Sequence, residues 1–260
     1  MRKNPDSFLI SNLNKLDYKY HFICLNNRYT VHRSLLIDNL ARCDLLKTNA
    51  YSWHDMRPTK QYFQKWNEHS YEFKYYDGST KVLDEQFVGI NKNQFSLPAE
   101  YYQSFFQIVS ETSESIKFIT EKTIAPLLIG KPFLIAGTNG IHQMIKNLGF
   151  ELYDELFDYS FDSMINITDR YESLCNSLKN ITDLSLDECK NLNNKIQDKV
   201  NYNRKRAIEV AYDQNLIPKL AKDVIQHHHN TREVLDTNLI KCFEYLTNKK
   251  SFVEQFKNYG

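Results

Sequence analysis

Neither charge dominates the 260-residue sequence, which holds 33 lysines and arginines against 32 aspartates and glutamates. Without an overall positive field, the chain has no general electrostatic attraction for nucleic acid, so any contact with nucleic acid must be local. The sequence also lacks an uncharged apolar run near the roughly 18 residues of a membrane-spanning helix. Its first residues lack the apolar stretch of a signal peptide. We therefore expect a soluble protein with no membrane span.

Cysteine and glycine are both sparse. The five cysteines are scattered without CxxC spacing, which is typical of reduced thiols, so we expect an intracellular, cytoplasmic protein. The seven glycines include one close pair, Gly137 and Gly140, in the turn "GTNG". That pattern is too short for the fingerprint with which dinucleotide-binding folds hold their cofactor, which argues against a nicotinamide-dependent enzyme.

The sequence does contain an alternation of strand-like apolar runs and helical patterns. Strands are predicted at residues 20–25 (YHFICL), 104–111 (SFFQIVSE), 131–137 (KPFLIAG) and 150–153 (FELY). Leucines at helical spacing follow the first run, and further helices are predicted at 120–128 and 139–149. Thr120 can cap the 120–128 helix, although Pro126 predicts a kink or an early stop. This alternation indicates an α/β fold with a Rossmann-like parallel sheet flanked by helices.

The limits of this alternation predict the domain organisation. Residues 1–18 form a polar N-terminal segment, and residues 19–172 form the Rossmann-like domain. Within that domain, residues 51–99 show poor periodicity and turn signals, so we expect a peripheral insertion with one or two short strands. Residues 173–260 carry helical patterns without a further strand signal and predict a helical C-terminal region.

Three polar clusters follow predicted strand ends, where open parallel sheets bind ligands and helix N-termini attract phosphate. They are residues 26–33 (NNRYTVHR), 110–115 (SETSES) and 120–122 (TEK). Arg28 and Arg33 can donate paired hydrogen bonds to a diphosphate, and Lys122 adds a compact third charge. Glu111 and Glu121 can accept hydrogen bonds from sugar or ribose hydroxyls. The alternative is that these side chains only cap helices or form a solvated charged surface.

The clusters belong to longer blocks that resemble a glycosyltransferase-like family of phages and large viruses. The blocks are residues 19–46, 101–115 and 118–162, with the later "DRY" at 169–171. More distantly, they are similar to the donor-binding domain of α1,3-fucosyltransferases. In those enzymes of the GT-B type, an Asn/Arg loop and an "ITEK" helix start hold a nucleotide diphosphate-sugar. The resemblance covers residues 19–172, and "ITEK" with the following apolar helix and strand is its most specific block.

This resemblance implies a metal-independent glycosyltransferase that needs no cofactor and moves a sugar from a nucleotide diphosphate-sugar to a glycan or other hydroxyl acceptor. The residues that it assigns by position to donor binding are Asn27, Arg28, Arg33, Thr120, Glu121 and Lys122. The cations among them would stabilise the departing diphosphate. Glu111 would lie near the sugar or ribose, and the base that deprotonates the acceptor would be His32 or a carboxylate, for which Glu111 is the candidate. The DxD motif of metal-dependent sugar transfer is absent.

The chain departs from the GT-B pattern in one respect. A GT-B enzyme has a second Rossmann-like domain that precedes the donor domain and holds the acceptor, whereas here residues 1–18 precede the first predicted strand. We therefore expect the acceptor site to come from the 51–99 insertion, from the C-terminal helices, or from a partner subunit of an oligomer. One alternative is a catalytically silent nucleotide-sugar-binding or assembly module that acts with a partner. Another is the glycosylation of modified viral DNA bases.

Weaker signals have structural interpretations. Adjacent histidines in "HHHN" (227–230) do not share a helix face, so a solvated run is favoured over a metal site. Asp158 and Asp162 would suit a metal or a base if they lay on one helix, but an acidic turn is the favoured interpretation. The basic patch at 201–206 (NYNRKR) is favoured as a solvated helix face that could meet an anionic acceptor.

Overall fold

The computed structural model describes residues 17–26, 29–54, 71–83, 97–114, 117 and 119–212. The chain divides into two compact units, residues 1–204 and residues 205–260. The parallel sheet and the helices that cover it belong to the first unit. None of the described helices is long and apolar enough to cross a lipid bilayer.

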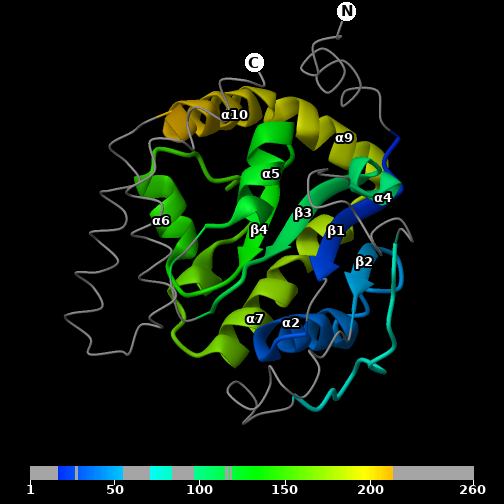
Figure 1. Cartoon of the computed structure of the whole chain (residues 1–260). Helices are drawn as coiled ribbons and strands as arrows, with labels where there is room; N and C mark the ends of the chain where they lie inside the picture. Colours follow the sequence, from blue (N-terminus) through cyan, green and yellow to red (C-terminus); the bar gives the residue numbers. More distant parts are fainter. Residues whose placement is uncertain are drawn as a thin grey trace, which may run out of the picture. The chain divides into compact units, whose positions relative to one another are not determined.

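A four-stranded parallel sheet forms the centre of this unit, in the order β2-β1-β3-β4 (Figure 1). The strands are β1 (Tyr20–Asn26), β2 (Ala50–Trp53), β3 (Ser104–Ser110) and β4 (Phe133–Ala136). Every residue of β3 is buried, as expected for a parallel strand that is covered on both faces. The strands β1, β3 and β4 coincide with the predicted runs, and the α/β Rossmann-like prediction is confirmed.

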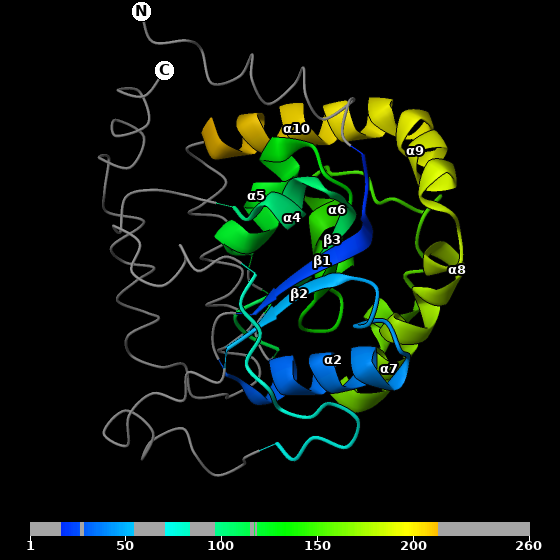
Figure 2. The same ribbon diagram turned by 90° about the vertical axis from the view of Figure 1, so that its right-hand side faces the viewer.

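Helices cover both faces of the sheet (Figure 2). The helices α2 (Val31–Arg42) and α7 (Ile167–Ser177) contact each other and lie on one face. On the other face lie α4 (Ala99–Tyr102), α5 (Glu121–Ile129) and α9 (Leu186–Lys195). The remaining helices are α6 (Ile141–Asn147), the 3₁₀ helix η2 (Ser160–Ser163), α8 (Lys179–Thr182) and α10 (Gln197–Tyr212). After η2 the described chain is helical, as the sequence predicted.

The ends of α5 show how local sequence sets an element. The hydroxyl of Thr120 accepts a hydrogen bond from the backbone N–H of Lys122, so Thr120 is the N-cap that the sequence predicted. The helix continues past Pro126 as far as Ile129. Gly130 then adopts a left-handed conformation with a φ of 82°, which ends the helix.

Two sequence predictions differ from the structure in the strands. Residues 150–153 form no strand, because the backbone N–H and C=O of Glu151 pair with the side-chain amide of Asn203, at 2.8 Å each. A side chain from a distant helix therefore occupies the backbone groups that a strand neighbour would need. In addition, the segment expected as a peripheral insertion begins with β2, which pairs with β1 at the edge of the main sheet.

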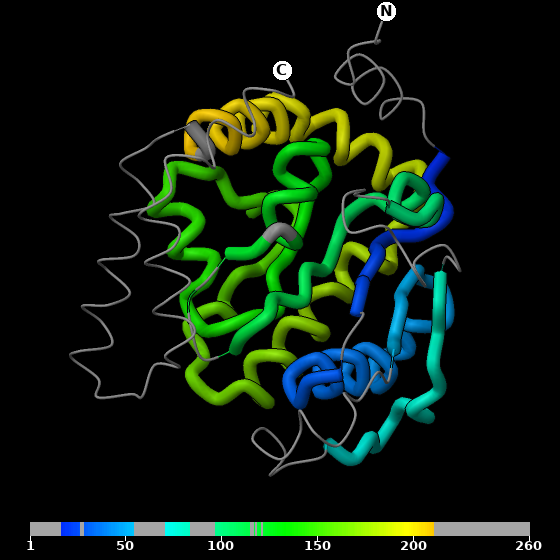
Figure 3. Tube along the Cα trace, in the orientation of Figure 1, coloured from blue at the N-terminus to red at the C-terminus, as the bar shows by residue number. Residues whose placement is uncertain are grey.

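The described part of that segment, residues 71–83, lies beside β2 and α2 (Figure 3). Lys81 pairs with Trp53 across an antiparallel bridge. The buried carboxylate of Asp38 on α2 accepts hydrogen bonds from the backbone N–H groups of residues 74–76 and from the hydroxyl of Tyr71. One carboxylate thus fixes a loop that has little regular structure of its own.

Candidate ligand site at the carboxyl edge of the sheet

The strand order places a topological switch point between β1 and β3. From β1 the chain passes through α2 to β2 on one side, whereas from β3 it passes through α5 to β4 on the other side. The helices α2 and α5 lie on opposite faces (Figure 2). The two chain segments therefore diverge at the carboxyl ends of β1 and β3, where open α/β sheets bind their ligands.

On the α2 side, His32 connects two segments that are far apart in sequence. Its Nε2 lies 2.9 Å from the carbonyl oxygen of Glu111, and its Nδ1 lies 3.0 Å from Oε2 of Glu114. Arg33 donates from Nη2 to the same Glu111 carbonyl, at 3.3 Å. Both helix residues are buried, whereas the Glu114 side chain is 43% exposed. This arrangement fastens the start of α2 to the loop after β3.

Both ring nitrogens of His32 face hydrogen-bond acceptors. A carbonyl and an ionised carboxylate can only accept hydrogen bonds, so the His32 ring is the donor where it bonds to either of them. The hydrogen bond from His32 holds the pKa of Glu114 below its usual value, and the charges of His32 and Arg170 act in the same direction against the opposing effect of burial. The partly exposed Glu114 carboxylate therefore lies in direct contact with the buried His32 ring.

The Glu111 side chain lies at the end of β3 and is completely buried. Its carboxylate accepts hydrogen bonds from both the N–H and the hydroxyl of Thr120, at 3.0 and 2.6 Å. It also accepts from the Thr123 hydroxyl at 2.6 Å and from the Thr112 N–H at 3.2 Å. Four internal donors occupy the carboxylate, which makes it the anchor of the α5 N-terminus. Its predicted contact with a sugar or ribose stays a prediction.

Lys122 lies in the first turn of α5. Its Nζ is 3.3 Å from the Thr112 hydroxyl oxygen and 3.5 Å from that of Thr120. The ammonium group thus lies at the N-terminus of α5, where the helix dipole already favours an anion. The backbone N–H groups of the first turn of α5 and the Lys122 side chain therefore both contribute positive potential at the N-terminus of this helix.

Buried polar atoms without a hydrogen-bond partner among the described residues gather at this same edge. Asn26 Oδ1, Trp53 Nε1 and Ser110 Oγ belong to the last residues of β1, β2 and β3. In the parallel register Asn26 pairs with Trp53. The pairing of Cys24 with Ile108, continued by two residues, brings Asn26 level with Ser110, so the three strands end together. In native proteins such atoms are rare, and a bound water or ion is one of the explanations for them. For Asn26 and Ser110 the sequence signal was a polar residue at the end of an apolar run, whereas Trp53 carried no such signal.

Two further atoms of this kind belong to α7. They are Arg170 Nε and the hydroxyl oxygen of Tyr171, and both side chains are at least 97% buried, with exposed fractions of 3% and 0%. Burial lowers the pKa of Arg170 and raises that of Tyr171, whereas the negative charge of Glu114 raises both pKa values. These residues form the "DRY" block of the resemblance, which carried no assigned role from sequence.

The structure brings most of the predicted site residues to one edge. Hydrogen bonds join His32 and Arg33 to Glu111, Glu111 to Thr120, and Thr120 to Lys122. Asn27, Arg28 and the side chain of Glu121 lie outside the described residues. The described members of the three clusters are thus linked to one another at the carboxyl ends of β1 and β3. Their individual roles towards a ligand stay predictions.

The weaker sequence signals lie elsewhere. Asp158 accepts from Ser160, and Asp162 accepts from the His142 ring at 2.8 Å, so both aspartates hold the turn before α7. The histidine run at 227–230 lies outside the described residues. Within the described ranges, no group of three or more His, Cys, Asp and Glu side chains is arranged to hold a metal ion.

Comparison of the chain with protein-family models, with curated proteins and with solved structures gave no match. The α/β architecture is established by the sheet itself, and the resemblance to glycosyltransferases stays an expectation from the sequence.

Proposed function

We propose that the carboxyl edge of the sheet binds the diphosphate of a nucleotide diphosphate-sugar and that the protein is a glycosyltransferase that uses this donor. The observation that carries the proposal is the switch point between β1 and β3. There, Arg33, Lys122 and the N-terminus of α5 contribute positive potential at one edge. The cluster of buried polar atoms without partners among the described residues supports a ligand at the same edge.

The chemistry would be displacement at the anomeric carbon of the sugar. The acceptor oxygen forms a bond to that carbon, the bond to the diphosphate oxygen breaks, and the cations of the edge stabilise the charge that develops on the leaving group. A general base must reach the acceptor hydroxyl directly or through one water molecule. Glu114 fits this requirement better than Glu111, because its side chain is 43% exposed whereas Glu111 is completely buried.

One observation favours a second candidate function, a nucleotide-sugar-binding module without turnover. His32 and Glu111, the two residues predicted as catalytic, are both engaged in internal hydrogen bonds. A base that is already bound on every available atom must break a contact before it can accept a proton. A protein of this kind would bind the donor and present it to a partner subunit.

Donor binding is tested by thermal denaturation of the full chain with nucleoside diphosphates and their sugar conjugates. A ligand at about 100 times its Kd adds about 2.7 kcal/mol to the free energy of unfolding. For a protein of this size, that corresponds to a rise in Tm of roughly 5–10 °C. The absence of a shift with every nucleoside diphosphate would remove the basis of the proposal.

The matched variants are Lys122→Ala and Lys146→Ala. Lys122 lies at the N-terminus of α5, whereas Lys146 is exposed in the last turn of α6. We expect Lys122→Ala to weaken nucleoside diphosphate binding by about tenfold or more, because it removes a hydrogen bond to a charged group. Lys146→Ala should leave the affinity unchanged. Release of free nucleoside diphosphate from the donor in the presence of acceptor then separates the transferase from the binding module.

A further inference from the structure

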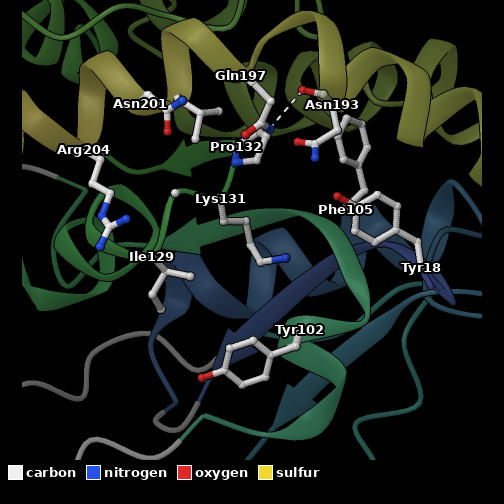
Figure 4. A pocket seen from close by; sticks show the side chains of 12 residues that line it. Tyr18, Tyr102, Phe105, Ile129, Lys131, Pro132, Asn193, Gln197, Asn201 and Arg204 are labelled. Atoms are coloured by element: carbon white, nitrogen blue, oxygen red, sulfur yellow. Dashed lines mark hydrogen bonds between the residues drawn. The ribbon is translucent and has the colours of Figure 1, made fainter. Parts of the chain in front are cut away.

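A cavity lies at the opposite, amino edge of the sheet (Figure 4). It has a volume of about 130 Å³ and lies between the start of the sheet and the helices α9 and α10. Lys131 lies at its centre, and Tyr18 and Phe105 line one side of it. The amide side chains of Asn193, Gln197 and Asn201 line the helical side. A cavity of this volume is well below the roughly 300–1,000 Å³ of pockets for drug-sized ligands, so it suits only a small ion or group.

Local sequence fixes Lys131 at this position. Gly130 ends α5 in the left-handed conformation, and the backbone N–H groups of Gly130 and Lys131 both donate to the carbonyl of Pro126, at 2.9 Å. This pair of hydrogen bonds closes the C-terminus of the helix, and Pro132 prevents the helix from continuing. The Lys131 side chain therefore reaches the start of β3, where it bonds to Ser104, and only 4% of the residue is exposed.

The ammonium group of Lys131 has only neutral partners among the described residues. It donates to the carbonyl and, at 3.3 Å, to the hydroxyl of Ser104, and it lies 5.1 Å from the centre of the Tyr101 ring. Burial lowers the pKa of Lys131 to about 7. Taking a cation out of water without an opposite charge is costly, and a hydrophobic side chain of similar length would fill the same volume without that cost.

The residues that line the cavity support a bound anion as the counter-charge of the Lys131 ammonium group. Among the described residues, the twelve that line the cavity include no acidic side chain, whereas two of them, Lys131 and Arg204, are cationic. Side-chain amides and a tyrosine hydroxyl offer neutral hydrogen-bond donors beside these charges. This set of donors without a carboxylate is the chemistry that recognises an oxyanion.

We propose that this cavity is a second ligand site that binds a phosphate-sized oxyanion, with Lys131 as its charged donor and the amides of α9 and α10 as its neutral donors. The site is independent of the carboxyl edge, because it lies at the other end of the strands and shares no residue with that edge. An anion in the cavity neutralises the buried ammonium and favours its protonated form.

Sulfate is the probe for the test, because its charge is constant near neutral pH whereas that of phosphate changes. Binding is measured by calorimetry on the full chain, at a pH about one unit below and about two units above the Lys131 pKa of about 7. The neighbouring phenols do not titrate in this range, because burial raises the pKa of Tyr18 to about 12 and also raises those of Tyr101 and Tyr102. We expect the affinity to fall by about tenfold or more at the higher pH, with proton uptake on binding.

Three variants separate the possible outcomes. Lys131→Met keeps the length of the side chain and should abolish the pH-dependent binding, whereas Lys122→Ala at the carboxyl edge should leave it intact. If Lys131→Met does not fold, Asn201→Asp serves instead, because this exposed residue lines the cavity and a carboxylate there should repel sulfate. Equal sulfate affinity at the two pH values, or binding that survives Lys131→Met and is lost in Lys122→Ala, would overturn the proposal. The latter result would leave the carboxyl-edge proposal standing.

Discussion

The substitution Glu111→Gln gives the sharpest test, because the structure and the sequence resemblance predict different outcomes for it. If Glu111 is a ligand-binding group, the substitution weakens donor binding and leaves the fold stable. In the structure, however, the carboxylate is completely buried and accepts four hydrogen bonds from Thr112, Thr120 and Thr123. The substitution should therefore destabilise the protein itself.

The expected magnitude follows from the geometry of the two carboxylate oxygens. Oε1 accepts from the Thr120 N–H and Oε2 from the Thr112 N–H, so a glutamine amide turned either way directs its NH₂ group at a backbone donor. An unsatisfied buried donor costs about 1–3 kcal/mol, and the remaining contacts lose the extra strength of hydrogen bonds to a charged group. We estimate a total loss of about 2–4 kcal/mol in the free energy of unfolding.

Thermal and urea denaturation of the full chain measure this loss. At about 2–4 °C per kcal/mol for a protein of this size, Tm should fall by roughly 4–16 °C. Thr112→Ser is a suitable control, because it keeps the backbone N–H that bonds to Glu111 and should change Tm by little. A Glu111→Gln protein with the Tm of the wild type would refute the assignment of Glu111 as an internal anchor.

Three further predictions concern stability. The pKa of Asp162 is lowered, because the hydrogen bonds from His142 outweigh the opposing effect of burial. Its contribution to the free energy of unfolding is therefore present above the unfolded pKa and is lost as pH falls through the folded pKa. The difference in Tm between wild type and Asp162→Asn should shrink on acidification below about pH 4, and a constant difference would contradict this. Asp38→Asn should speed proteolytic cleavage within residues 71–83, because the carboxylate holds the backbone of that segment; identical digestion rates would show that other contacts hold it. Gly130→Ala should cost about 1–2 kcal/mol, because its φ is 82° and a Cβ would meet Val200 at 3.2 Å. Because Val200 is buried and its truncation has a cost of its own, the Gly130→Ala, Val200→Ala double variant is compared with Val200→Ala alone. The backbone cost should remain in that comparison, and equal stability of these two variants in urea denaturation would argue against it.

Local signals in the sequence were sufficient for the elements that depend on a few neighbouring residues. Thr120 caps α5 because its hydroxyl reaches the N–H of Lys122 two residues ahead, and Gly130 ends the helix because it adopts a positive φ at little cost. Strands β1, β3 and β4 were predictable because continuous apolar runs must be buried on both faces of a parallel sheet. Each of these features depends on interactions within a few residues or on burial alone.

Features that depend on distant partners were decided by the tertiary structure. Residues 150–153 have the composition of a strand, but the Asn203 side chain occupies the backbone groups of Glu151. Glu111 has the appearance of a ligand-binding carboxylate in sequence, yet the fold places three threonines around it. The donor or acceptor that each polar group meets is set by chain segments far away in sequence. The sequence determined which residues could carry charge and hydrogen bonds at the strand ends, and the fold determined which of them are already satisfied from within.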